Sequence, residues 1–183
     1  RCLSLMETKH DHQLHDEQSR HDNRNLRIDK VGVRDLRFPI RVLDKANEHQ
    51  DTIATIGMYV DLPHNFKGTH MSRFIEVLNA HGNVVHVENI PNILQAMQQS
   101  LDTQTAHLEM DFPFFLEKNA PVTGKGGLMD YQARFKATAC GPEIDFVLQV
   151  GVNVTTLCPC SKAISKAGAH NQRGQVTVQL RSC

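Results

Sequence analysis

Apolar and polar residues alternate along several stretches of this chain, the pattern expected of a strand that buries one face. The longest such run covers residues 144–154, where every second residue is apolar. Shorter runs of the same kind cover residues 36–43, 53–60, 108–114, 131–138 and 175–180. Each of these runs is predicted to be a strand. The runs at residues 36–43 and 53–60 are expected to pair as a hairpin.

Between the runs at residues 53–60 and 108–114 the apolar residues change to a helical spacing. Thr69 is a candidate N-cap for a helix that ends at Gly82, and Pro91 is suited to the first turn of a second helix that reaches Leu101. The apolar positions of these two helices include Met71 and Met97, which we expect to pack in the core.

Turn residues separate the predicted strands. Residues 45–51 form a polar turn, residues 119–127 are rich in Pro and Gly, and Gly141 is followed by a proline. Pro39 lies within the first strand, which indicates an edge strand or a bulge. The predicted order is β-β-α-α-β-β-β, followed by a last strand that is cut short. It predicts an α+β fold, with an antiparallel sheet and two adjacent helices on one face.

Composition limits the other possibilities. Residues 1–27 are polar, rich in histidine and without apolar period, so they are predicted to be a disordered tail before a single domain over residues 28–183, truncated at its C-terminus. The formal net charge is zero, which does not favour nucleic acid or a membrane surface as partner. No apolar run long enough for a membrane helix or a signal peptide is present, so a cytoplasmic location is expected.

Candidate chemistry is concentrated in residues 157–173, directly after the longest strand. Cys158, Cys160 and His170 are potential ligands of zinc or iron, and in a cytosolic chain such thiols indicate metal binding or reactivity before a disulfide. Cys158 and His170 are two ligands, whereas a structural zinc site usually has four and a catalytic one three plus water. Cys160 is a less suitable third ligand because one intervening residue strains the chelate ring. The spacing leaves open whether Cys158 has a chemical role, as a metal ligand or a nucleophile, or is a small buried hydrophobe, as cysteine commonly is.

Cationic residues close to these ligands predict an anionic substrate. Lys162 and Arg173 would favour a thiolate at Cys158, and a guanidinium can bind two phosphate oxygens at once. Upstream, Lys67 and His70 lie at the predicted start of the first helix, where free backbone N–H groups favour an anion. For His70, a purely structural position at the helix start is the alternative.

These motifs resemble the metal-dependent GTP cyclohydrolase IB family, also called type IV. The resemblance rests on LCPCSK (157–162), GAHNQR (168–173), VGVRDLRFP (31–39) and KGTHMSRF (67–74), which occur in the family's order. It covers nearly everything outside the polar tail. It implies the tunnelling fold, in which an antiparallel sheet carries two helices on one side and subunits close into barrels.

The resemblance also implies a reaction and its site. GTP would be converted to 7,8-dihydroneopterin triphosphate and formate, the first step of folate and pterin biosynthesis. Cys158 and His170 would bind a catalytic divalent ion (zinc, manganese or iron(II)) in a homo-oligomer, a tetramer in the family. The family's further metal ligand and its guanine-binding glutamate lie beyond the point that matches Cys183. Two alternatives stay open: a catalytically incomplete pterin- or purine-binding fragment, and a tunnelling-fold enzyme with Cys158 as covalent nucleophile.

Overall fold

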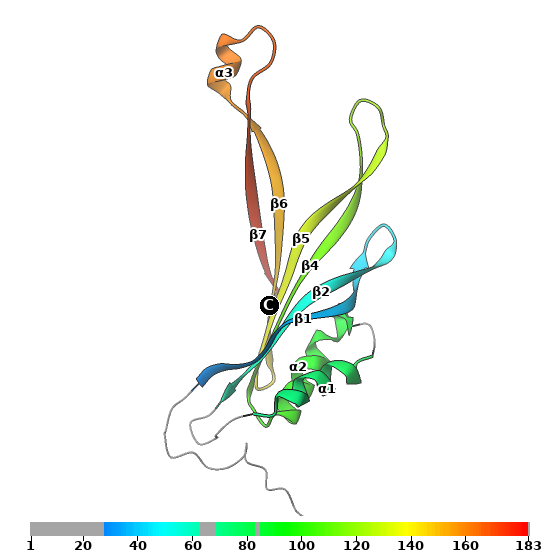
Figure 1. Cartoon of the computed structure of the whole chain (residues 1–183), viewed down its shortest axis with the longest axis vertical. Coiled ribbons are helices and arrows are strands. Elements are labelled where there is room, and N and C mark those ends of the chain that lie inside the picture. The colour runs from blue at the N-terminus through cyan, green and yellow to red at the C-terminus, as the bar shows by residue number, and fades with distance from the viewer. Residues whose placement is uncertain (1–27, 63–68, 83–84, 183) are drawn as a thin grey trace, which may run out of the picture.

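A single seven-stranded sheet with two helices on one face makes up most of the structure, a computed structural model that describes residues 28–62, 69–82 and 85–182 (Figure 1). The predicted α+β class is confirmed. The elements are β1 (Ile28–Asp44), β2 (Glu48–Leu62), α1 (Met71–Ala80), β3 (Val85–His86), α2 (Ile90–Ser100), β4 (Thr105–Asn119), β5 (Gly126–Cys140), β6 (Glu143–Leu157), α3 (Pro159–Ile164) and β7 (Asn171–Ser182).

The sheet has the order β3-β1-β2-β4-β5-β6-β7, so nearly every strand pairs with its neighbour in the sequence. All pairings are antiparallel except that of β1 with the two-residue β3, which the sequence analysis did not predict. The strands are longer than their apolar runs. The predicted turn over residues 45–51 is shorter than expected, since β2 begins at Glu48, and the last strand begins at Asn171 rather than Gln175. Antiparallel hairpins extend their hydrogen bonding into solvent, where no apolar alternation is needed.

The bulge of β1 lies before Pro39 rather than at it, and the two-residue β3 pairs outside β1, so the prediction of an edge strand or a bulge is not met at Pro39 itself. The strand has a register shift between Val33 and Leu36, and Asp35 in this bulge has a φ of 60°. On its outer side, β1 is paired with β3 at Ile40 and Arg41. A proline is tolerated here because its missing N–H removes no bond from a central ladder.

The two predicted helices are confirmed, with one correction at the first N-terminus. Thr69 is not the N-cap of α1; the cap is His70, whose side chain makes no capping hydrogen bond. The C-terminal prediction was right, because Gly82 follows the cap residue His81 with a φ of +96°, a conformation that favours glycine. Helix α2 carries Pro91 in its first turn, as predicted.

The core lies between the helices and one face of the sheet. Helix α1 packs on β1, and α2 packs on β4 and β5. The inward residues of β2 and β4 alternate with outward ones and are almost completely buried, among them Ile56, Met58, Leu108 and Met110. Met97 of α2 is fully buried, as expected, whereas Met71 is 41% exposed because it occupies the first residue of α1 on the solvent side.

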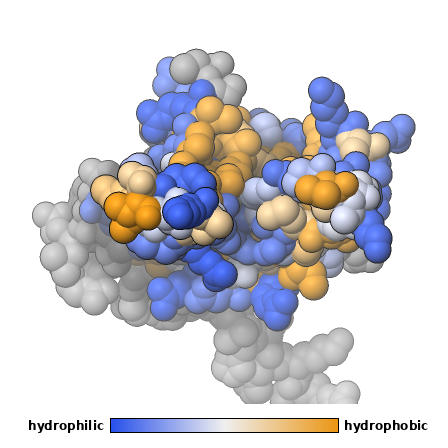
Figure 2. Space-filling model, turned by 90° about the horizontal axis from the view of Figure 1, so that it is seen from above, coloured by the Kyte–Doolittle hydropathy of each residue, from blue (hydrophilic) through white to orange (hydrophobic). Residues whose placement is uncertain are grey.

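The same apolar face continues beyond the helices without cover. It forms a groove of about 690 Å³, lined by residues that include Phe112, Phe135 and Leu148. On β7, Val178 and Leu180 lie opposite Val150 and Leu148 of β6 and therefore extend this face, yet they are 46% and 59% exposed. Seen from the end that carries the hairpin tips, apolar side chains are exposed among polar ones (Figure 2).

Candidate functional site

The connection between β6 and β7 holds most of the predicted site residues. The last pair of the hairpin ladder is Leu157 with Asn171, and residues 158–170 form the connection, which includes α3. At its base the backbone N–H of Cys158 donates to the carbonyl oxygen of His170 at 3.2 Å. The twelve-residue spacing therefore brings the backbones of the predicted thiol and imidazole ligands together.

Cys158 also caps α3. Its Sγ accepts a hydrogen bond from the backbone N–H of Ser161 at 3.5 Å, and its carbonyl oxygen accepts one from the N–H of Lys162 at 3.1 Å. Pro159 occupies the first turn, where its fixed φ suits a helix start. The short helix α3 thus begins directly after Cys158, whose thiol caps it.

Ser161 was not predicted from the sequence to be a site residue. Its hydroxyl accepts a hydrogen bond from the backbone N–H of His170 at 3.3 Å, while its own N–H donates to Cys158. One serine therefore links the two predicted ligands. The sequence signal was weak, because a serine three residues after a helix cap is common.

The residues of this connection differ in exposure. Cys158 is half-buried, whereas Cys160 in the first turn of α3 is exposed. His170, Lys162 and Arg173 are exposed. Arg173 lies on β7 opposite Thr155, three residues beyond His170. Lys162 and Arg173 therefore belong to the same end of the hairpin as the predicted ligands.

The described residues supply only part of a metal site. Among them, no group of three or more His, Cys, Asp and Glu side chains is arranged to hold a metal ion. Cys158 and His170 are donors of types that transition metals accept. They fit as two ligands of a site that needs at least one more donor.

The upstream motif lies elsewhere. Lys67 is outside the described residues. His70 caps α1, where its carbonyl oxygen accepts a hydrogen bond from the N–H of Arg73 at 3.1 Å. Figure 1 shows α3 at one end of the long axis and α1 toward the other. The chain does not bring His70 together with Cys158.

The antiparallel sheet with two helices on one face is consistent with a tunnelling-type α+β protein, which here carries a cysteine–histidine pair at the tip of the β6–β7 hairpin. Comparison with known families identifies the family to which the chain belongs. Residues 14–183 match the family described as type I GTP cyclohydrolase folE2, and the chain belongs to this family.

Curated relatives support the assignment. GTP cyclohydrolase FolE2 of Syntrophotalea carbinolica is 52% identical over 168 residues, which cover 92% of this chain and 63% of the relative. GTP cyclohydrolase FolE2 of Akkermansia muciniphila is 54% identical over 171 residues, covering 92% of this chain and 65% of the relative. The chain thus spans less than two thirds of the length of these relatives. Within the described residues, no helix has the length and apolar character needed to span a membrane.

Proposed function

We propose that this protein is a GTP cyclohydrolase, which converts GTP and water to 7,8-dihydroneopterin triphosphate and formate at the start of folate and pterin biosynthesis. Family membership over residues 14–183 supports the reaction class. The observation that carries the proposal is the hydrogen-bonded junction of Cys158 and His170, because it joins two metal-binding side-chain types at one exposed hairpin end.

The charge of this hairpin suits a nucleoside triphosphate. From Phe146 to the last residue the sequence contains no Asp or Glu. The same stretch contains Lys162, Lys166, Arg173 and Arg181, and the first three lie in or beside the connection. A cationic surface without acidic residues attracts a polyanion, and Arg173 can bind two phosphate oxygens at once.

The metal belongs to the proposal too. We infer a divalent ion (zinc, manganese or iron(II)) with Cys158 and His170 as two ligands, and further ligands from outside the described residues. When bound, such an ion supplies a Lewis acid that activates water for attack on the guanine ring. The N–H of Ser161 donates to the sulfur of Cys158 and orients it, and the two hydrogen bonds of the His170 backbone hold His170 beside Cys158.

Assembly and location complete the proposal. We propose a homo-oligomer, a tetramer as in the family. The exposed edge strand β7 and the exposed side chains of Val178 and Leu180 are compatible with further packing. We propose a cytoplasmic enzyme.

The chain offers a matched control for the central test. Cys158→Ala should abolish formate release from GTP in the full-length protein, together with metal binding. Cys160→Ala removes an exposed thiol two residues away and should leave both unchanged. If Cys158→Ala retains wild-type turnover, the catalytic assignment is wrong.

A second candidate keeps the fold and changes the chemistry. The hydrogen bond from Ser161 to the sulfur of Cys158 would equally stabilise a thiolate that attacks a purine-like substrate. Metal analysis separates the two, since full activity without bound metal would favour the nucleophile. Calorimetry with GTP tests a third candidate, a binding fragment without catalysis, which would bind GTP but release no formate.

A further inference from the structure

His107 of β4 lies on the face of the sheet that is turned away from the helices. Its neighbours Ala106 and Leu108 are buried in the core, so the alternation directs His107 to the other side. In the sheet it is paired with Tyr59 of β2 and Thr138 of β5. Nothing in the sequence around this histidine predicts a role for it.

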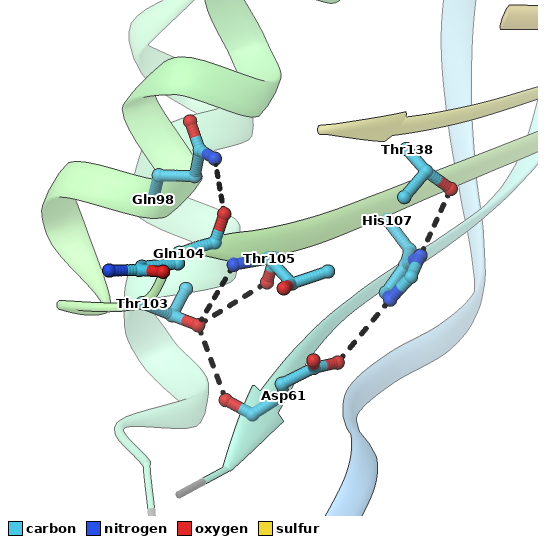
Figure 3. A network of polar contacts seen from close by, with 7 residues as sticks. All are labelled: Asp61, Gln98, Thr103, Gln104, Thr105, His107 and Thr138. Atoms are coloured by element: carbon cyan, nitrogen blue, oxygen red, sulfur yellow. Dashed lines mark hydrogen bonds and ion pairs between the residues drawn. The ribbon is translucent and has the colours of Figure 1, made fainter. Parts of the chain in front are cut away.

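Both ring nitrogens of His107 have partners (Figure 3). Nδ1 lies 3.0 Å from Oγ1 of Thr138, and Nε2 lies 3.4 Å from Oδ1 of Asp61. Only 14% of the histidine side chain and 25% of the aspartate side chain are exposed. An ionised carboxylate only accepts hydrogen bonds, so Nε2 carries a proton and donates to Asp61. In the neutral ring Nδ1 then accepts from the hydroxyl of Thr138.

Burial of the ring, more than the charges around it, favours this neutral form. Lys30 of β1 faces it with a positive charge, whereas Asp61 of β2 and Glu109 of β4 face it with negative ones. The pKa of His107 is lowered from its ordinary value, chiefly by burial and further by Lys30, against the opposing effect of the two carboxylates. The ring is therefore neutral near pH 7.

Asp61 makes a second contact through its backbone carbonyl oxygen. The hydroxyl of Thr103, in the connection between α2 and β4, lies 3.3 Å from the carbonyl oxygen of Asp61. The same hydroxyl lies 3.3 Å from the carbonyl oxygen of Thr105 and accepts from the N–H of Thr105 at 3.4 Å. The end of β2, the α2–β4 connection and β4 thus meet at one aspartate (Figure 3).

Two hydrogen bonds and a short stretch of chain lead from this junction to the predicted substrate residue His70. Thr103 follows the end of α2 closely, and the carbonyl oxygen of Ser100 there accepts a hydrogen bond from Nη1 of Arg73 at 2.8 Å. The backbone N–H of Arg73 donates in turn to the carbonyl oxygen of His70. All these contacts lie among described residues.

We propose that His107 is a positioning residue. By donating to the carboxylate of Asp61 it fixes the junction at the end of β2. Through Thr103, Ser100 and Arg73 this junction fixes His70 for binding of the GTP phosphates. The inference rests on the proposed function. His107 itself touches no substrate in this scheme, so its effect belongs to substrate affinity rather than to the chemical step.

Two substitutions at His107 separate the two ring nitrogens. His107→Gln places an amide N–H near the position of Nε2, so it can keep the bond to Asp61. His107→Asn reaches only the position of Nδ1, so it can keep the contact with Thr138 and loses Asp61. In the full-length protein we expect His107→Asn to raise the KM for GTP by about tenfold, the lower range for loss of an orienting partner, with kcat within about twofold. His107→Gln should restore the wild-type KM.

Amide hydrogen exchange gives a readout that needs no GTP. His107→Asn should speed exchange of the N–H of Arg73, which donates to His70, whereas His107→Gln should not. If His107→Asn fails to fold, Thr103→Val removes the other hold on Asp61 and should produce the same rise in KM and the same faster exchange.

The outcomes distinguish this inference from the proposed function. An unchanged KM and unchanged exchange in His107→Asn, with turnover still dependent on Cys158, would overturn the positioning role alone. Equal defects in the Asn and Gln variants would also overturn it, because they would indicate a packing role for the ring. If the wild-type protein releases no formate from GTP, the proposed function fails, and the exchange experiment still decides whether His107 holds the start of α1.

Discussion

The helix-covered strands and the β6–β7 hairpin have the same apolar alternation but very different surroundings. On β4, Leu108 is 1% exposed beneath α2, whereas Leu180 on β7 faces the same side of the sheet and is 59% exposed. The difference lies in what packs on the strand, because alternation selects the face and a second layer buries it. An alternating run therefore predicts which residues can be buried, and only the neighbouring layer determines how far they are.

The two regions also differ in their polar chemistry. On the far face of the helix-covered strands, polar groups such as Asp61 and His107 pair with one another in a half-buried network. At the end of the β6–β7 hairpin, cations such as Lys162 and Arg173 are exposed and the segment has no acidic residue. We infer that the first region supplies most of the folding stability and that the second is available for a ligand.

The largest expected effect concerns the covered region. Leu108→Ala should lower the free energy of unfolding by about 2–5 kcal/mol, because it removes a fully buried side chain and leaves a cavity under α2. Denaturant unfolding followed by circular dichroism measures this change. A loss below about 1 kcal/mol would mean that the core beneath the helices is less tightly packed than its burial indicates.

The next effect concerns activity rather than stability. His170→Ala should reduce formate release by about 100-fold or more, because it removes a proposed metal ligand from an exposed connection. The midpoint of thermal unfolding should change little, since the ring is not part of the core. His49→Ala, in an exposed position at the start of β2, is the control and should leave turnover intact. Normal turnover in His170→Ala would place the chemistry elsewhere.

The stability of the helix-covered strands should depend on pH through His107 of β4. Because the pKa of His107 is lowered below its usual 6.5 in the folded protein, the unfolded chain binds more protons when the pH falls through that value. The contribution of this group to stability is therefore present above about pH 6.5 and is lost at lower pH. Unfolding measured from pH 7.5 to 5 should show a smaller decrease in His107→Gln than in wild type. Parallel curves would contradict the lowered pKa.

The smallest expected effect tests the uncovered face directly. Leu180→Ala should change the unfolding free energy of this 183-residue chain by only about 0.5 kcal/mol, since the side chain is 59% exposed and its removal opens no cavity. Comparison with Leu108→Ala uses the same substitution on the same face of one sheet. A loss as large as at Leu108 would show that Leu180 is covered in solution.

Much of the architecture could be predicted because its signals are local. The alternation gave the hairpins, the helical spacing gave α1 and α2, and Gly82 marked the end of α1. The pairing of Cys158 with His170 also followed from local information, since a strand end and a short helical turn return the chain to its starting point. The N-cap of α1 was missed by one residue because Thr69 is the better capping type, whereas the helix begins at Met71 after His70.

By itself, the sequence determined which residues share a face, where the chain turns, and that a thiol and an imidazole occupy one hairpin end. Only the tertiary structure decided that β3 pairs with β1, that Ser161 links Cys158 to His170, and that His107 joins Asp61 to Thr138. It also decided that α1, capped by His70, and α3, capped by Cys158, lie toward opposite ends of the long axis (Figure 1). The reason is physical: periodicity records local burial, whereas contacts between distant residues depend on strand register and on the layer that packs above.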